Sequence, residues 1–318
     1  MRLALFGMAS ILLLAHAAIG AEPATQPALA DRLHTHVSKL AGEIGPRGVY
    51  APAKNDATVE YIEAQLRAAG YEPTRQSFDV PNMKVQATNI IAEKQGSDHA
   101  DEIIVLGAHH DSVSTTPGAD DNASGVAGLL ESARMLKDVK TTRTIRFVFF
   151  ANEEPPFFQT ERMGSLVYAK ACKARGDKIT AMVCYEMLGY YSDAPNSQHA
   201  PAILPAALKQ NLPTVANFLS LVTNVANNDL VERCRVSFQQ ATDLPVLAVA
   251  LPEVIEGVDY SDHWSFWRAG YPAIMATDTS FFRNDHYHGP TDKPDTLDYA
   301  RMAKAVEGLT GIGKALAE

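Results

Sequence analysis

Short apolar runs alternate along the chain with stretches whose apolar residues recur at helical spacing. The runs, which are typical of buried strands, are residues 78–80, 89–92, 103–106, 144–151, 181–185 and 273–277. The helical repeats predict helices over residues 29–44, 57–69, 126–136, 166–174, 214–225 and 299–316. Because strands and helices alternate, we predict a single α/β domain with a mixed, mainly parallel central sheet and helices on both faces.

The N-terminal residues stand apart from this pattern. Arg2 supplies a positive charge before an apolar stretch over residues 3–14, and small residues follow, as in a secretory signal. We therefore expect a signal peptide over residues 1–20, a secreted or periplasmic protein, and no stable membrane insertion after the signal is removed. A retained anchor is the alternative, but the apolar stretch is short for a membrane span.

The folded domain is expected over residues 28–318. Within it, residues 190–257 are rich in Pro, Asn and Gln and contain one clear helical repeat. This composition indicates an insertion or a covering lobe within the domain.

Composition and charge narrow the class of protein. The chain has 318 residues, of which 46% are hydrophobic and 20% are charged, as in ordinary globular proteins. The net charge of -9 makes a nucleic-acid partner unexpected, because phosphate binding needs a basic surface. Cys172, Cys184 and Cys234 allow one disulfide and one free thiol, and their spacing indicates no particular pairing. The oligomeric state is not indicated.

Side chains able to bind a metal follow four of the predicted strands. They are His109, His110 and Asp111 after 103–106, Glu153 and Glu154 after 144–151, Glu186 after 181–185, and Asp285, His286 and His288 beyond 273–277. Each alone has an ordinary explanation as a loop residue. Because the carboxyl ends of parallel strands share one edge of a sheet, the four together predict one site, and imidazole and carboxylate are ligands that zinc takes.

A two-metal hydrolytic site needs such a set. One carboxylate bridges the two ions, further ligands hold each ion, and a base takes a proton from water. Glu153 and Glu154 suit the roles of base and ligand, because adjacent residues at a strand end point in different directions.

The chain resembles the co-catalytic zinc aminopeptidases, metallopeptidase family twenty-eight, which includes bacterial secreted leucyl-type aminopeptidases, glutamate carboxypeptidases and glutaminyl cyclases. The matching motifs, in the family's order, are His109-His110-Asp111, Pro117-Gly118-Ala119-Asp120-Asp121-Asn122-Ala123-Ser124-Gly125, Glu153-Glu154, Glu186-Met187-Leu188-Gly189, Ser261-Asp262-His263 and Tyr287-His288. The resemblance implies a zinc-exopeptidase (phosphorylase/hydrolase-like) fold, a peptide substrate and two Zn²⁺ ions.

The resemblance also implies a role for each residue. Asp121 would bridge the ions, with Asp120 as its competitor in the same loop. The remaining assignments are His109 and Glu186 on one metal, Glu154 and His288 on the other, Glu153 as general base, Asp111 orienting His109, and Tyr260 and Tyr287 as donors to the oxyanion. His110 is the poorer candidate of its pair, since alternation turns it away.

The chain departs from the family pattern at two places. Glu186 stands where the family commonly has Asp, and both residues bind zinc. An enlarged loop over residues 155–163 follows the Glu pair. Its Phe157 and Phe158 either pack in the core or line an apolar specificity pocket beside the metals.

These observations predict an exported zinc exopeptidase, an aminopeptidase with a metal-bridging water and Glu153 as general base. The chain has no Gly-x-Ser-x-Gly, His-Glu-x-x-His, Gly-x-Gly-x-x-Gly or Walker sequence. A single-zinc glutaminyl cyclase is one alternative, needing only Asp121, Glu154 and His288. A carboxypeptidase or dipeptidase would share all the ligands, and a non-enzymatic binding module should have lost some of them.

Overall fold

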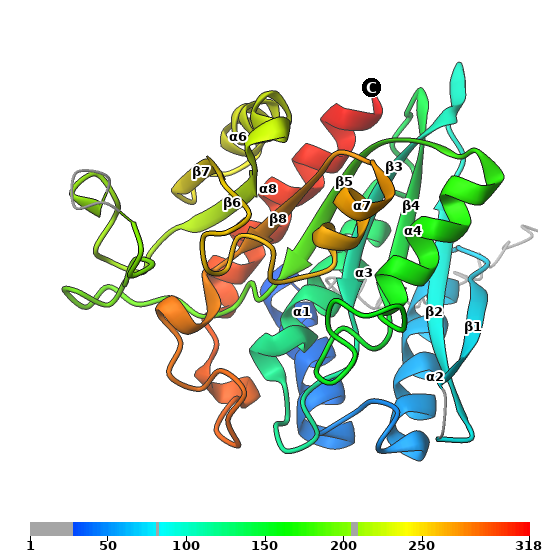
Figure 1. Ribbon diagram of the computed structural model, residues 1–318, viewed down its shortest axis with the longest axis horizontal. Helices are drawn as coiled ribbons and strands as arrows, with labels where there is room; N and C mark the ends of the chain where they lie inside the picture. Colours follow the sequence, from blue (N-terminus) through cyan, green and yellow to red (C-terminus); the bar gives the residue numbers. More distant parts are fainter. Residues whose placement is uncertain (1–27, 81–82, 205–208) are drawn as a thin grey trace, which may run out of the picture.

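The computed structural model describes residues 28–80, 83–204 and 209–318, and the predicted signal segment 1–20 lies outside them. The described strands form one sheet in the order β1–β2–β4–β3–β5–β8–β6–β7 (Figure 1). They are β1 (Thr74–Val80), β2 (Val85–Lys94), β3 (His99–His109), β4 (Arg143–Phe150), β5 (Lys178–Glu186), β6 (Leu219–Asn224), β7 (Val246–Leu251) and β8 (Ala273–Thr277). The central strands β4, β3, β5 and β8 are parallel, as are β6 and β7, while β1–β2, β2–β4 and β6–β8 are antiparallel. The predicted mixed, mainly parallel sheet is confirmed.

Helices cover both faces of this sheet. They are α1 (Leu29–Val37), continued by a π-helical segment (Ser38–Ile44), α2 (Pro52–Ala68), α3 (Gly125–Leu136), α4 (Gly164–Arg175), α6 (Asn228–Ala241), α7 (His263–Ala269) and α8 (Tyr299–Ala317). In Figure 1, α4 and α7 lie in front of the sheet and α3 and α8 behind it. None of the described helices is long and apolar enough to cross a membrane.

The central strands are apolar on both faces because each face has its own core. Along β3, Leu106 belongs to the large cluster on the α3 and α8 face, while Val105 belongs to the cluster on the α4 and α7 face. Phe149 and Phe150 of β4 divide in the same way. Successive strand residues point to opposite faces, so a strand buried on both sides becomes a continuous apolar run.

The helix predicted over residues 214–225 is wrong, since these residues contain strand β6. Leu219 and Leu221 pack into the α8 face of the core, and Val222 faces the other side. A short apolar run fits a strand or a buried helix equally well, and here pairing with β7 and β8 decides. The segment 190–257 thus supplies β6, α6 and β7 to the main layers, while its described residues 190–204 and 209–218 precede β6 outside the sheet.

The three cysteines are buried and have free thiols. None of them therefore forms a disulfide in this structure.

Candidate metal centre

The candidate ligands meet at the topological switch point of the sheet, where the strand order reverses. Strand β3 lies between β4 and β5, so the chain moves from β3 to one side and then crosses to the other. His109 ends β3, Glu153 and Glu154 follow β4, and Glu186 ends β5. The carboxyl edge at such a switch point is where open α/β sheets place their binding crevice.

Asp121 lies at the centre of this group, with its two carboxylate oxygens facing different partners. Its Oδ1 is 3.3 Å from Nε2 of His109, and the same nitrogen is 3.3 Å from Oε2 of Glu186. Its Oδ2 is 3.1 Å from Nε2 of His288, which is 3.3 Å from Oε2 of Glu154. The geometry therefore consists of two small ligand sets that share one carboxylate.

These spacings suit metal ions. Ligand atoms about 2.0–2.1 Å from a tetrahedral zinc ion lie about 3.3–3.4 Å from one another, close to the distances found here. His109, Asp121 and Glu154 form a group of three residues whose ligand atoms all lie within 4.8 Å of one another. Glu186 and Glu153 are 7% exposed, so several buried carboxylates crowd together, and a bound cation would relieve their repulsion.

Burial and crowding shift the titration of the carboxyl groups. Burial raises the pKa of Glu153 well above its usual range, the His109 imidazole opposes the shift, and Glu154 and Glu186 add to it. Burial, together with Asp121, raises the pKa of Glu154 to about 8. For Asp121, hydrogen bonds from His109 and His288 outweigh burial and hold its pKa below the usual range. Burial thus shifts the pKa of Glu153 and that of Glu154 in the same direction, upward.

Asp111 fixes the turn that carries the two glutamates. Its Oδ1 and Oδ2 each accept a hydrogen bond of 3.1 Å, from the backbone amides of Glu153 and Glu154 respectively. The Nδ1 of His109 lies 3.2 Å from the backbone carbonyl of Asp111 and 3.6 Å from its Oδ1. Asp111 therefore faces both His109 and the glutamate turn, and only the first of these contacts was expected.

Two residues that sequence reasoning missed hold the loop that carries Asp121. Asp292 accepts hydrogen bonds from the amides of Asp120 (2.8 Å) and Asp121 (3.2 Å). Arg47, only 2% exposed, donates to three carbonyl oxygens of the same loop, those of His110, Pro117 and Gly118. No local sequence pattern marks either residue, because their partners are far away along the chain.

His110, Tyr260 and Tyr287 lie outside the two ligand sets. The Nε2 of His110 lies 3.0 Å from the carbonyl oxygen of Thr88, away from the ligand sets. The ring of Tyr287 stacks on His288 at 3.8 Å between centroids. Tyr287 and Tyr260 also line a cavity beside the site.

Phe157 and Phe158 are not among the residues that line this cavity. Phe157 packs against a small core cluster that includes Val49 and Ala151. The ring of Phe158 packs edge-on against Tyr260, with centroids 6.0 Å apart. Of the two alternatives drawn from the sequence, Phe157 thus follows the core packing, while Phe158 contacts Tyr260, which lines the cavity.

Comparisons with known proteins support the fold and identify a family. The sequence model of peptidase family M28 matches residues 89–311. The chain is 36% identical over 300 residues to the Escherichia coli (strain K12) protein named "Uncharacterized protein YfbL", covering 92% of this chain and 90% of that protein. It is 27% identical over 274 residues to a "Probable leucine aminopeptidase" of Arthroderma otae, covering 81% of this chain and 64% of that protein.

Solved structures share the fold at low sequence identity. The zinc aminopeptidase BSAP from Bacillus subtilis superposes with a TM-score of 0.72 at 16% identity, covering 91% of this chain and 95% of that chain. The glutaminyl cyclase of Fimbriiglobus ruber gives a TM-score of 0.64 at 18% identity, covering 94% and 99%.

The fold, the acid- and histidine-rich site and these matches define a metal-dependent exopeptidase. The chain belongs to peptidase family M28, whose model spans more than two thirds of it. The family resemblance drawn from the sequence motifs is confirmed.

Proposed function

We propose that the protein is an exported zinc aminopeptidase that removes the N-terminal residue of peptides. The observation that carries the proposal is the placement of Asp121, with one oxygen toward His109 and the other toward His288. This is the arrangement that a bridging carboxylate between two ions requires. The likeness to aminopeptidases in sequence and fold supports the same reaction.

The residues around Asp121 would divide between two ions, His109 and Glu186 on one side and Glu154 and His288 on the other. Two bound zinc ions would supply polarisation of the peptide carbonyl and a more acidic water. Ser261 donates a hydrogen bond of 2.5 Å to Oε2 of Glu186 and so orients that carboxylate.

Glu153 would serve as the general base. Its Oε2 lies 3.8 Å from Nε2 of His109, close to the ligand sets, and Asp111 fixes its backbone. The raised pKa suits a carboxylate that takes a proton from the attacking water and passes it to the leaving amine. The phenol of Tyr287, next in sequence to His288, would donate to the developing oxyanion.

A single-zinc glutaminyl cyclase on the same fold is the second candidate, supported by the likeness to a solved cyclase. It would need only Asp121, Glu154 and His288. Here His109 also lies 3.3 Å from Asp121, and Glu186 lies 3.3 Å from His109, which favours the two-metal peptidase.

Metal counting by elemental analysis of the purified protein tests the choice, together with assays of leucyl-anilide hydrolysis and of ammonia release from N-terminal glutaminyl peptides. Two ions with hydrolysis support the aminopeptidase, whereas one ion with ammonia release supports the cyclase. Protein that binds no metal and acts on neither substrate would point to a binding module. Hydrolysis only from the C-terminus, or only of dipeptides, would assign a carboxypeptidase or dipeptidase.

Export is part of the proposal and has its own test. N-terminal sequencing of the protein recovered from the periplasm or the medium should show residues 1–20 removed. A chain that stays in the cytoplasm with Met1 in place would contradict the predicted secretion.

A further inference from the structure

A cavity of about 300 Å³ opens beside the candidate metal centre. Of the candidate site residues, Glu186, Tyr260 and Tyr287 line this cavity. From there the cavity is lined by Gln198, Leu204 and Leu212, and it reaches the edge strand β7 at Leu247. Its volume lies at the lower end of the range for pockets that hold small organic ligands.

The floor of the cavity follows one row of residues across the sheet. Glu186 pairs with Thr277 of β8, Thr277 pairs with Ser220 of β6, and Ser220 pairs with Leu247 of β7. Directly paired residues project from the same face of a sheet, and neighbouring strands lie about 4.8 Å apart. The row therefore runs about 14 Å from a candidate metal ligand to the far wall.

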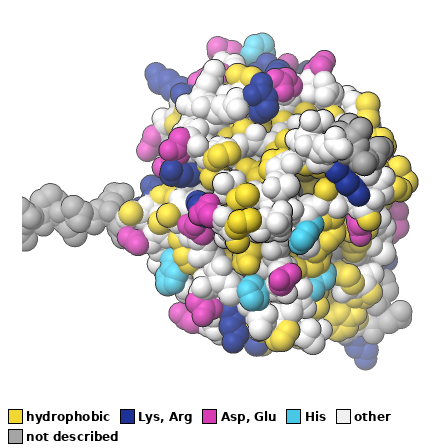
Figure 2. All heavy atoms as spheres, turned by 90° about the vertical axis from the view of Figure 1, so that its left-hand side faces the viewer, with side chains coloured by type: hydrophobic (Ala, Val, Ile, Leu, Met, Phe, Trp, Pro, Cys, Tyr) yellow, Lys and Arg dark blue, Asp and Glu magenta, His cyan; other side chains and the backbone are white. Residues whose placement is uncertain are grey.

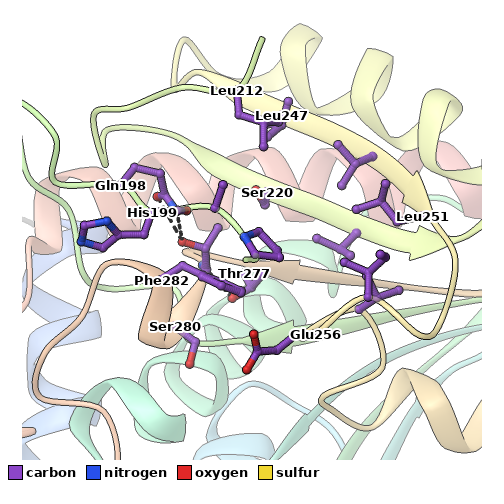
Figure 3. Close-up of a pocket in the computed structure, with 18 of the residues that line it drawn as sticks. Gln198, His199, Leu212, Ser220, Leu247, Leu251, Glu256, Thr277, Ser280 and Phe282 are labelled. Carbon is purple, nitrogen blue, oxygen red and sulfur yellow. Dashed lines mark hydrogen bonds between the residues drawn. The ribbon is translucent and has the colours of Figure 1, made fainter. Parts of the chain in front are cut away.

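The polarity of the walls changes along this row. Figure 3 shows Glu256 and Ser280 on one side of the cavity and Leu212 and Leu247 on the opposite side, with Leu251 farther along β7. Val222 and Val249 add to the apolar part. The row thus begins at the carboxylate of Glu186 and ends at apolar side chains of β7, which suits a ligand with a polar head and an apolar tail.

The outer surface on the β7 side is also largely apolar near its middle. Figure 2 views the molecule from the β7 side and shows patches of hydrophobic side chains in the middle of this face, with charged side chains mostly toward its rim. Every residue of β7 is partly exposed, although all six are apolar.

The length of the row exceeds what a leucine side chain can fill. Three carbon–carbon bonds separate the Cα of leucine from its terminal methyl groups, a reach under about 4 Å by the geometry of extended chains. A substrate with leucine at its N-terminus would leave the part of the cavity near Leu247 and Val249 empty.

We infer that this cavity binds the side chain of the substrate's N-terminal residue, and that it selects elongated apolar side chains, longer than leucine. This inference rests on the proposed aminopeptidase function. Each added methylene that enters the apolar part should raise kcat/KM about fourfold until the far wall is reached.

A series of aminoacyl anilides with straight side chains tests the inference. The series is alanyl, norvalyl, norleucyl and 2-aminooctanoyl. From norvalyl to 2-aminooctanoyl, three methylenes longer, kcat/KM should rise about 60-fold. A maximum at norvalyl, with no gain for longer chains, would overturn the inference while leaving the aminopeptidase function standing.

Variants locate the effect. Val249→Phe fills the far end, and should lower kcat/KM for 2-aminooctanoyl at least tenfold while alanyl hydrolysis stays within twofold. Val254→Phe makes the same chemical change at a position that is 78% exposed and does not line the cavity. This control should leave kcat/KM unchanged for both the 2-aminooctanoyl and the alanyl substrate. If Val249→Phe fails to fold, Ser220→Leu blocks the row nearer the site and should act already on norleucyl substrates. An equal loss on all substrates in the filling variants would contradict the inference.

Calorimetric titration with free norvaline, norleucine and 2-aminooctanoic acid tests the selectivity of the cavity separately from the proposed aminopeptidase function. If the zinc-loaded protein hydrolyses no aminoacyl anilide, the proposed function fails, and binding alone decides on the cavity. Affinity that rises with chain length in wild type and not in Val249→Phe supports the inference, and affinity independent of length overturns it.

Discussion

Asp120 and Asp121 are neighbours in the chain, yet their carboxylates face different groups. Asp121 faces His109 and His288, at 3.3 and 3.1 Å. Asp120 instead accepts hydrogen bonds from the amide of Gly189 (2.9 Å) and from Asn284 (2.7 Å). Two identical side chains one residue apart therefore take up different positions in the site.

This difference predicts unequal effects on metal binding. Asp121→Asn should weaken the binding of both ions together, by more than ~100-fold, because one carboxylate serves both ligand sets. Asp120→Asn should weaken binding less and mainly lower the thermal stability, because the Asp120 carboxylate accepts two buried hydrogen bonds. Zinc titration by calorimetry measures the first effect, and greater sensitivity at Asp120 would reverse the assignment.

The position of Glu153 predicts loss of turnover without loss of metal. Glu153→Gln keeps the size of the side chain but cannot accept a proton as a carboxylate does. We expect kcat to fall by at least ~10²-fold, with metal content by elemental analysis unchanged. Glu43→Gln, at a surface carboxylate paired with Lys39, is the control. Wild-type turnover in Glu153→Gln would remove this residue from the role of base.

The two phenylalanines of the enlarged loop should behave differently. Phe157→Ala removes a ring from a small apolar cluster and from a stack on Tyr50, with centroids 6.3 Å apart, and should cost about 2 kcal/mol of stability. Phe158→Ala removes the support of Tyr260 in the cavity wall, and should change the ratio of kcat/KM between leucyl and alanyl substrates several-fold. Denaturation curves and paired kinetics separate the two effects. An unchanged ratio in Phe158→Ala would place both rings in purely structural roles.

Glu131 on α3 predicts a pH-dependent stability remote from the metal centre. Burial alone would raise the pKa of Glu131, but hydrogen bonds from His36, Arg32 and Arg134 lower it to about 2. Since the folded state then binds the proton less tightly than the unfolded state, this stabilisation is fully present above about pH 4.5 and is lost as the pH falls toward 2.

The test compares wild type with Glu131→Gln in urea. The variant should be less stable at pH 7 by about 1–3 kcal/mol, and the gap should narrow between pH 4.5 and 2. Glu72→Gln, at an exposed carboxylate outside this cluster, should show no such narrowing. A gap that stays constant with pH would mean that the Glu131 charge contributes nothing to stability.

Local patterns in the sequence determined the class of fold and the location of the site. The apolar runs at 103–106, 144–151 and 181–185 correspond to β3, β4 and β5, because strands buried on both faces leave few polar positions. The polar residues that follow them lie together because parallel strands end at one edge. Both signals are contained within a few consecutive residues.

Tertiary structure decided what depends on partners far away in the chain. The run around 219–224 became strand β6 only through pairing with β7 and β8, since its own pattern also fits a helix. Asp120 and Asp121 took different orientations because Asn284 and Gly189 hold one of them. The long cavity exists because Glu186, Thr277, Ser220 and Leu247 fall into one register across four strands. Strand register and side-chain orientation are set by long-range pairing and hydrogen bonds, which the sequence of any one segment does not contain.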